Sequence, residues 1–189
     1  MPFADVPAFM ATLGDSVEDR AGRLLILTGS RRGEALFAKW SEFDFAKRIW
    51  TIPGDTVDKA TGKVIKGRMK NRKPHVVPLT DAMVEALGTP GAPEANVFPS
   101  ARTGGMLGHK TLEPKTWCAP YTVHGFRTSL TTWAQEQDDG RAYPQPVILA
   151  AIAHNTQENE SDASYLRSNL FEARRKLMQA WSEFVTGRA

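Results

Sequence analysis

The sequence has a single cysteine, Cys118, so it cannot form an internal disulfide and holds no cysteine cluster of the metal-binding kind. No apolar run approaches the ~20 residues that a membrane-spanning helix needs. Residues 1–13 are mixed in character and lack the basic segment followed by an apolar stretch that marks a secretory signal. These absences argue against a disulfide-rich secreted protein or a membrane protein, and they predict a cytoplasmic location.

Positive charge is modest in total but concentrated in one segment. The net charge of +3 and the pI of about 9.1 indicate only a weak preference for a polyanionic partner. Seven basic residues lie between positions 59 and 73, next to a single acid, Asp58; they are Lys59, Lys63, Lys66, Arg68, Lys70, Arg72 and Lys73. Such a cluster is typical of a phosphate-binding surface, and a solvated basic loop is the alternative explanation.

Apolar periodicity and turn residues predict an α+β fold that is mostly helical, with a small antiparallel sheet. Ser16, with Asp19 three residues later, indicates a capping box at the start of a helix that Gly29 ends. Further helices are expected over residues 32–40, 80–87, 123–135, 147–154 and 170–185. Two β-rich segments, 48–53 and 74–79, flank a glycine-punctuated stretch and predict long hairpins. Residues 103–120 show no clear period, and 189 residues suffice for one domain with its own core.

Cleavage of a phosphodiester without a metal requires a particular set of side chains. The transition state gains negative charge on its non-bridging oxygens, and guanidinium groups match that geometry because they present paired donors. A hydroxyl nucleophile must attack in line, and the departing 5′-oxygen needs a proton. Two arginines, one or two histidines, a lysine and a hydroxyl form a sufficient set. The sequence lacks a phosphate-binding P-loop and clustered carboxylates suited to Mg²⁺, which fits chemistry of this kind.

The chain offers most of that set in order. The candidates are Arg31, Glu34, His124, Arg127, His154 and Tyr165. Arg31 and Glu34 lie just after a helix–glycine turn, where the Glu34 carboxylate is close enough to orient the Arg31 guanidinium. The next histidine and arginine are three residues apart, a spacing that places both on one face of a helix. The second histidine ends an apolar helix, and the tyrosine follows in a polar segment. Each signal alone also has an ordinary explanation: a surface ion pair, a solvated helix face or a half-buried packing tyrosine.

These residues stand within a series of motifs that resembles the tyrosine recombinases, specifically the integrases of temperate phages, satellite phages and genomic islands. The matching segments are TGSRRGE (28–34), WSEFD (40–44), WTIP (50–53), RMKNRKPHVVPL (68–79), VFPS (97–100), TVHGFR (122–127), IAH (152–154), SYLR (164–167) and RRKLMQAW (174–181). They occur in the family's order and cover nearly the whole chain. The series is therefore far more specific than any single motif, and it implies the family's catalytic domain.

The resemblance implies a role for each catalytic candidate, namely Arg31, Lys70, His124, Arg127, His154 and Tyr165. The two arginines are expected to clamp the scissile phosphate, and the two histidines to complete the cradle, with packing as the alternative role of His154. Lys70 matches the hairpin lysine that protonates the departing 5′-oxygen. Tyr165 matches the nucleophile, which forms a 3′-phosphotyrosyl link. Glu34 matches a support for the first arginine and takes no part in the chemistry.

The resemblance also implies partners. We expect DNA contacts from the basic cluster, through Lys63, Lys66, Arg68, Arg72 and Lys73. The partner is double-stranded DNA at attachment sites, bound by a homotetramer, with accessory DNA-bending or directionality proteins, in the cytoplasm of a bacterial host. The phosphotyrosyl link conserves bond energy, so no ATP, metal or other cofactor is expected. Residues 1–189 are expected to form the catalytic domain alone, without the core-binding and arm-binding domains that usually precede it.

Three departures from the family pattern leave alternatives open. The stretch 54–66 is longer than the compact hairpin of the nearest integrases, so Lys66 or Lys73 could take the place of Lys70. The interval between the second histidine and the tyrosine is one residue longer than is typical, and Ser164 stands where relatives often have alanine. Residues 104–120 match poorly. The rival functions are a type IB topoisomerase and a catalytically idle DNA-binding remnant, and the apolar face of the tail helix could cover either a neighbouring subunit or its own core.

Overall fold

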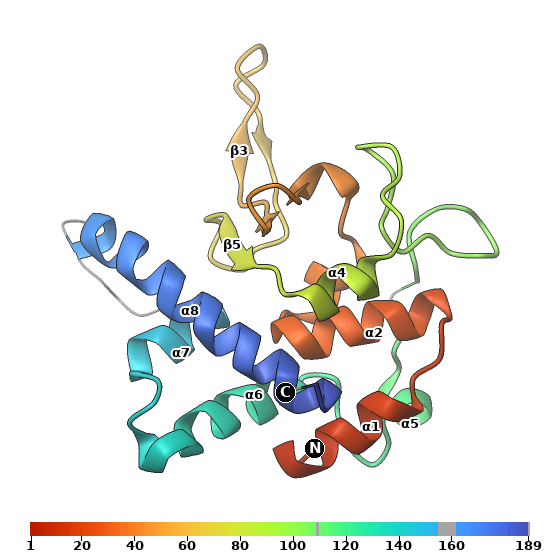
Figure 1. Ribbon diagram of the computed structural model, residues 1–189. Helices are drawn as coiled ribbons and strands as arrows, with labels where there is room; N and C mark the ends of the chain where they lie inside the picture. Colours follow the sequence, from red (N-terminus) through yellow and green to blue (C-terminus); the bar gives the residue numbers. More distant parts are fainter. Residues whose placement is uncertain (109, 155–161, 189) are drawn as a thin grey trace.

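The computed structural model describes residues 1–108, 110–154 and 162–188, and helices form most of its framework (Figure 1). The α-helices are α1 (Val6–Thr12), α2 (Val17–Thr28), α3 (Arg32–Leu36), α4 (Asp81–Leu87), α5 (Pro114–Trp117), α6 (Gly125–Glu136), α7 (Gln145–Ala151) and α8 (Asp162–Thr186). Short 3₁₀ turns are η1 (Phe3–Asp5), η2 (Trp40–Glu42) and η3 (Gln137–Gly140). The strands are β1 (Phe43–Asp44), β2 (Ile49–Ile52), β3 (Thr56–Val57), β4 (Val64–Ile65) and β5 (His75–Pro78). The α+β fold, mostly helical with a small antiparallel sheet, is confirmed.

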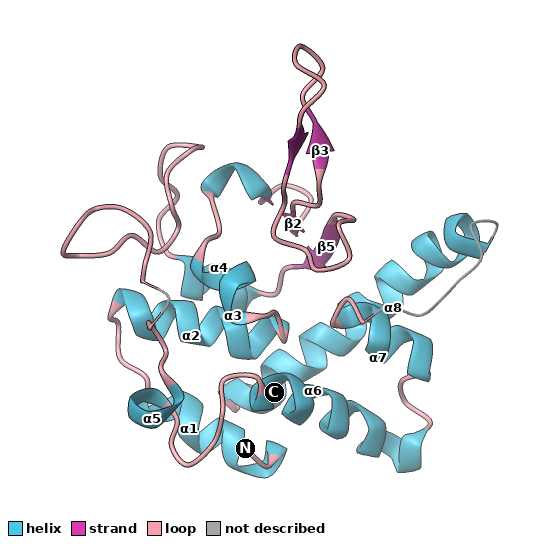
Figure 2. Cartoon of the chain, turned by 180° about the vertical axis from the view of Figure 1, so that it is seen from behind, coloured by secondary structure: helices cyan, strands magenta, loops and turns pink. Residues whose placement is uncertain are grey.

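The strands form two separate antiparallel units. A three-stranded sheet has the order β1-β2-β5, so β5 lies at an edge. The chain leaves this sheet after β2, runs out through the two-stranded ribbon β3–β4, and returns into β5. Seen from behind, the ribbon projects away from the helical body (Figure 2). The predicted long hairpin is therefore present, and it carries the basic cluster at its base and along its length.

Helix α2 has the start and stop that its sequence predicts. The Ser16 hydroxyl accepts a hydrogen bond from the amide of Asp19 at 3.0 Å, which satisfies one of the free donors of the first turn. At the other end Gly29 adopts φ 59, the left-handed conformation that suits glycine after a helix. The apolar residues Leu24 to Leu27 are all essentially inaccessible to solvent, so α2 lies in the centre of the core.

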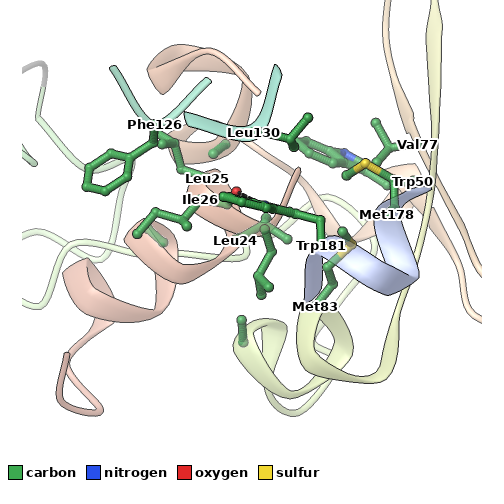
Figure 3. Close-up of a cluster of buried hydrophobic side chains, with 14 of the residues drawn as sticks. Leu24, Leu25, Ile26, Trp50, Val77, Met83, Phe126, Leu130, Met178 and Trp181 are labelled. Atoms are coloured by element: carbon green, nitrogen blue, oxygen red, sulfur yellow. Dashed lines mark hydrogen bonds between the residues drawn. The ribbon is translucent and has the colours of Figure 1, made fainter. Parts of the chain in front are cut away.

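Helix α8 packs its second half onto the same core. It contacts α1, α2, α4, α6 and α7, and its residues Leu177, Met178 and Trp181 are fully buried. Figure 3 shows Trp181 beside the α2 residues, and its indole N–H donates to Ile26 O at 3.0 Å. Trp133 packs against the same indole at a tilt of 55°, with 5.3 Å between ring centroids, and Phe184 adds a third ring to this aromatic cluster. The apolar face of the tail helix thus covers its own core.

Several predicted boundaries were wrong. The helix expected over 32–40 ends at Leu36, because the following backbone bonds elsewhere: Val97 N donates to Ala38 O and Trp40 N to Ala95 O. Such tertiary partners outweigh local propensity. The tail helix begins at Asp162, well before the expected residue 170, and therefore includes Tyr165. The N-terminal segment, for which no element was predicted, forms η1 and α1.

None of the described helices has the length and apolar character required to cross a membrane.

Candidate active site

Arg31 is held by the turn that follows α2. The turn passes through Gly29 and the buried Ser30, and Arg31 then precedes the first residue of α3. Glu34 binds Arg31 twice: one carboxylate oxygen accepts from the Arg31 amide and the other from its guanidinium, both at 2.7 Å. Glu34 is 3% exposed, so this carboxylate is withdrawn from solvent and committed to the arginine. This is the geometry expected of a support for Arg31.

Arg127 is buried on α6 and uses two backbone carbonyls as partners. Its guanidinium donates to Gly29 O at 3.0 Å and to Ile152 O. Because Gly29 belongs to the turn that presents Arg31, the two arginines meet at one place although they are distant in sequence. Burial lowers the pKa of Arg127 to about 10, and the charge of Arg31 contributes to the same shift. Even so, the guanidinium remains charged near neutral pH.

The end of α7 is shaped by a tight C-terminal turn. Ala153 adopts φ 49, and the amide of His154 donates to Leu149 O at 2.9 Å, the bond pattern that closes a helix through a left-handed residue. This turn leaves Ala151 O and Ile152 O free to accept hydrogen bonds from side chains. It also places His154, which is exposed, two residues after Ile152, whose carbonyl binds Arg127.

A narrow cavity, too small to hold a water molecule, lies where these segments meet. Its lining combines the turn after α2, α3, β5, α6 and the end of α7, through Thr28, Gly29, Ser30, Glu34, His75, Val77, Arg127, Ala151 and Ile152. His75 was not among the residues predicted for the site. Its Nε2 lies 3.3 Å from Ala151 O, and the ring faces Arg174, Arg127 and Arg31. Burial first, and then these positive charges, lower the pKa of His75 to about 4.

The base of the hairpin is firmly anchored. Gly54 and Gly67 allow its two arms to cross at close range, because a Cβ at either position would collide with backbone atoms. Met69 is buried, and the amide of Asp55 donates to Arg72 O at 2.7 Å. Arg68 binds the Glu42 carboxylate through both terminal nitrogens, and the Trp50 indole donates to the same carboxylate at 2.9 Å. Arg68 therefore holds the hairpin to η2.

Lys70 follows this anchored base and is exposed. The other predicted DNA contacts, Lys63, Lys66, Arg72 and Lys73, are exposed as well. The ribbon β3–β4 also exposes apolar side chains: Val57 is 61%, Val64 61% and Ile65 56% accessible. The hairpin thus combines a fixed base with an outer part that is open to a large partner.

The two remaining catalytic candidates are His124 and Tyr165. His124 directly precedes α6 and is exposed, three residues before Arg127 but not part of the cavity lining. Tyr165 lies in the first part of α8, and its side chain is outside the part of the chain that the structure describes, as are residues 155–161. The site therefore brings together Arg31, Glu34 and Arg127 by direct geometry, and places His154 on the same turn as one of their partners.

Comparison with known proteins identifies the family. The model of the phage integrase family matches residues 1–101, which is more than half of the 189 residues. The chain belongs to the phage integrase family. The matched part holds Arg31, Glu34 and the whole hairpin, so the resemblance read from the motifs is confirmed.

Several curated relatives of this family member are integrases. It is 30% identical to the prophage integrase IntA of Escherichia coli K12 over 95% of the chain, which corresponds to 42% of that protein. It is 28% identical to the integrase of Enterobacteria phage P4 and 25% identical to that of Shigella phage Sf6, in each case over 98% of the chain. These matches span 45% and 47% of the two phage proteins, so the chain covers less than half of their length. No solved structure matches significantly.

Sequence reasoning on this integrase family member missed two residues of the site, His75 and Arg174. Arg174, on α8, donates from Nη1 to Val76 O at 2.8 Å, and burial lowers its pKa to about 10. Both residues lie inside motifs that were used for the resemblance, RMKNRKPHVVPL and RRKLMQAW. A histidine at a strand start and an arginine on an amphipathic helix give no local signal of their own. Only the packing of α8 and α7 against β5 reveals them.

Proposed function

We propose that this chain is the catalytic part of a site-specific DNA recombinase, which cleaves and rejoins double-stranded DNA through a 3′-phosphotyrosyl link at Tyr165. The observation that carries the proposal is the meeting of Arg31 and Arg127 beside a single supporting carboxylate, Glu34. Two guanidiniums with one carboxylate leave an excess of positive charge. A bound phosphodiester would balance that charge and accept paired hydrogen bonds.

Each catalytic candidate then has one task. The Tyr165 hydroxyl releases its proton to solvent as its oxygen attacks phosphorus, and the bond from phosphorus to the 5′-oxygen breaks. Lys70 gives its proton to that oxygen, so a 5′-hydroxyl departs, while Arg31 and Arg127 stabilise the charge on the non-bridging oxygens. His124 and His154 complete the cradle. A 5′-hydroxyl from a partner strand reverses the step, and the DNA leaves with a new neighbour while the tyrosine is restored.

The hairpin supplies the proposed contact with the duplex. Its exposed cations, Lys63, Lys66, Arg72 and Lys73, suit the phosphate backbone and carry no sequence information by themselves. Arg68 was expected to contact DNA, but we assign it a structural role, because both of its terminal nitrogens bind Glu42. We infer that it fixes the base from which Lys70 reaches the cleavage site. A tetramer on attachment-site DNA is the assembly that we expect.

Covalent trapping tests the proposal. The chain is incubated at low salt with a pool of randomised duplexes that carry a nick near the centre, so that a cleaved end is lost and the adduct accumulates. Protein–DNA adducts are isolated under denaturing conditions and sequenced. We expect adducts with the parent chain and none with Tyr165→Phe. Tyr121→Phe is the matched control, because it removes a hydroxyl elsewhere in the chain and should trap DNA at the parental level.

Two outcomes contradict the proposal in different ways. Trapping that survives Tyr165→Phe assigns the wrong nucleophile, and DNA binding without any adduct points to the idle DNA-binding protein. The trapped sequence is then built into two assays, relaxation of a supercoiled plasmid and transfer of a cleaved strand to a second duplex. Relaxation without transfer would favour the type IB topoisomerase over the recombinase.

A further inference from the structure

His75 connects the hairpin to the helical body. It is the first residue of β5 and pairs with Ile52 of β2. Its side chain reaches the end of α7, where Nε2 lies 3.3 Å from Ala151 O. A carbonyl oxygen only accepts hydrogen bonds, so Nε2 carries the proton and donates it. In the neutral ring this leaves Nδ1 as an acceptor.

The neutral form is the relevant one, because the ring is largely buried and faces Arg174, Arg127 and Arg31. A neutral ring whose N–H is engaged by Ala151 has no donor left for a phosphate oxygen. His75 therefore lines the cavity next to the proposed phosphate site without serving as a phosphate ligand. Its contribution must come through the groups that it holds in place.

Arg127 does not depend on His75 for its position, because it has Gly29 O and Ile152 O as its own partners. Strand β5 differs. It is the edge strand of its sheet, and two side-chain bonds fasten it to the helices: His75 to α7, and Arg174 Nη1 to Val76 O at 2.8 Å. The hairpin residue Lys70 stands only a few positions before this strand. Loss of the His75 bond thus loosens the hairpin and leaves the arginines in place.

We propose that His75 is a positioning residue, whose hydrogen bond to Ala151 O sets the hairpin lysine Lys70 at the correct place relative to the phosphate held by Arg31 and Arg127. The inference rests on the proposed function. In this proposal His75 supports the protonation of the leaving group, because it positions Lys70. It takes no direct part in binding the phosphate.

Two substitutions isolate the bond. His75→Gln places an amide nitrogen close to where Nε2 stands and keeps the donor to Ala151 O. His75→Asn is equally polar, but its amide is too short and corresponds to Nδ1. Adduct formation is measured on the trapped sequence with either oxygen or sulfur at the bridging 5′ position. A thiolate leaves without protonation, so the sulfur substrate does not need Lys70.

We expect His75→Asn to cleave the oxygen substrate about 10²-fold more slowly than the parent, and to approach the parent on the sulfur substrate. His75→Gln should match the parent on both. Equal slowing of His75→Asn on the two substrates, a parental rate on oxygen, or a His75→Gln as slow as His75→Asn would each overturn the proposal. If His75→Asn does not fold, the rate of His75→Gln on the oxygen substrate still tests the proposal. A parental rate supports it, and a slow rate overturns it.

A second readout is independent of activity. Hydrogen exchange of the amides in residues 68–78 should be faster in His75→Asn than in His75→Gln, with the rest of the chain unchanged. Unaltered exchange there would show that the bond does not hold the hairpin. If the parent forms no Tyr165-dependent adduct, the proposed function has failed, and the exchange experiment still tests the tie between His75 and α7.

Discussion

The arginine cluster and the hairpin are built in opposite ways. Arg127 is 6% exposed, has carbonyl partners from two other segments, and stands beside the buried Glu34. Lys70 and the cations around it are exposed, although the hairpin beneath them is anchored by Arg68 and Met69. The first region pre-arranges charge before any ligand arrives, which reduces the reorganisation needed during a reaction. The second offers side chains that adjust to a partner.

The largest expected effect separates chemistry from stability in the hairpin. Lys70→Ala should slow adduct formation by about 10²–10⁴-fold, because the departing 5′-oxygen loses its proton donor. The free energy of unfolding should stay within about 0.5 kcal/mol of the parent, because the side chain is exposed. Sulfur at the bridging position should restore the rate for Lys70→Ala and not for Tyr165→Phe.

The matched controls for Lys70 are the two alternative donors. Lys66→Ala and Lys73→Ala remove the same charge from the same hairpin. When the DNA is saturated with protein, so that the weaker phosphate contacts of these variants do not limit the rate, each should cleave the oxygen substrate near the parental rate. If Lys70→Ala keeps the parental rate and one of the controls is slow, the donor is that control residue.

In the arginine cluster, by contrast, a substitution should affect both properties. Arg127→Lys retains the charge but cannot serve Gly29 O, Ile152 O and a phosphate together, since an ammonium lacks the planar fork. We expect a rate loss of about 10²–10³-fold and a lower midpoint of urea unfolding. Sulfur substitution should not rescue the rate. A stable variant with parental rate would mean that the two carbonyls are not essential partners.

His75 joins the two regions and predicts a pH dependence of stability. Its pKa of about 4 in the folded chain lies below the ordinary value of 6.5, so the unfolded chain binds more protons between these values. Stability is fully present above pH 6.5 and falls as the pH drops toward 4. By pH 4.5 the parent should lose about 2 to 3 kcal/mol more than His75→Gln, which cannot titrate there. Urea unfolding at pH 7 and pH 4.5 measures the difference, and equal losses would show that His75 is not buried beside Arg174, Arg127 and Arg31.

The smallest expected effect concerns DNA affinity. Binding by the chain should be weak, nearly indifferent to sequence and steeply reduced by salt, because Lys and Arg contacts to phosphate dominate it. Lys63→Ala or Lys66→Ala should each reduce the slope of log K against log salt by about 1. Lys176→Ala, which removes an exposed charge from α8, is the control and should leave the slope unchanged. Tight, salt-insensitive and site-selective binding would contradict this assignment of the hairpin.

What the sequence predicted well is what local residues decide. The start of α2 at Ser16 and its end at Gly29 follow from cap chemistry that acts within a few residues. The hairpin follows from two β-rich segments that flank glycines, and β2 and β5 do pair. Motif order supplied the candidates Arg31 and Arg127, and the hydrogen bond from Arg127 to Gly29 O joins their two motifs in space.

What the sequence did not predict depends on distant partners. Nothing near Ala38 signals that its carbonyl accepts from Val97, and that bond helps to end α3 early. The role of His75 requires α7 to end at Ala151 on the far side of the cavity. Arg174 likewise has its partner Val76 nearly a hundred residues away. These contacts come from the packing of whole elements against one another. Apolar periodicity and capping residues report only local structure, so they cannot predict such packing.

The aromatic cluster of Trp133, Trp181 and Phe184 has an optical consequence. The Trp181 indole is fully buried, bonded to Ile26 O, and lies 5.3 Å from the ring of Trp133. An indole in such surroundings emits at short wavelength, and two rings this close exchange excitation. Any event that lifts α8 from the core would separate the rings and wet the indole. Trp181 therefore serves as an intrinsic fluorescence probe on the helix that carries Tyr165, and its emission can be followed in real time while DNA is added.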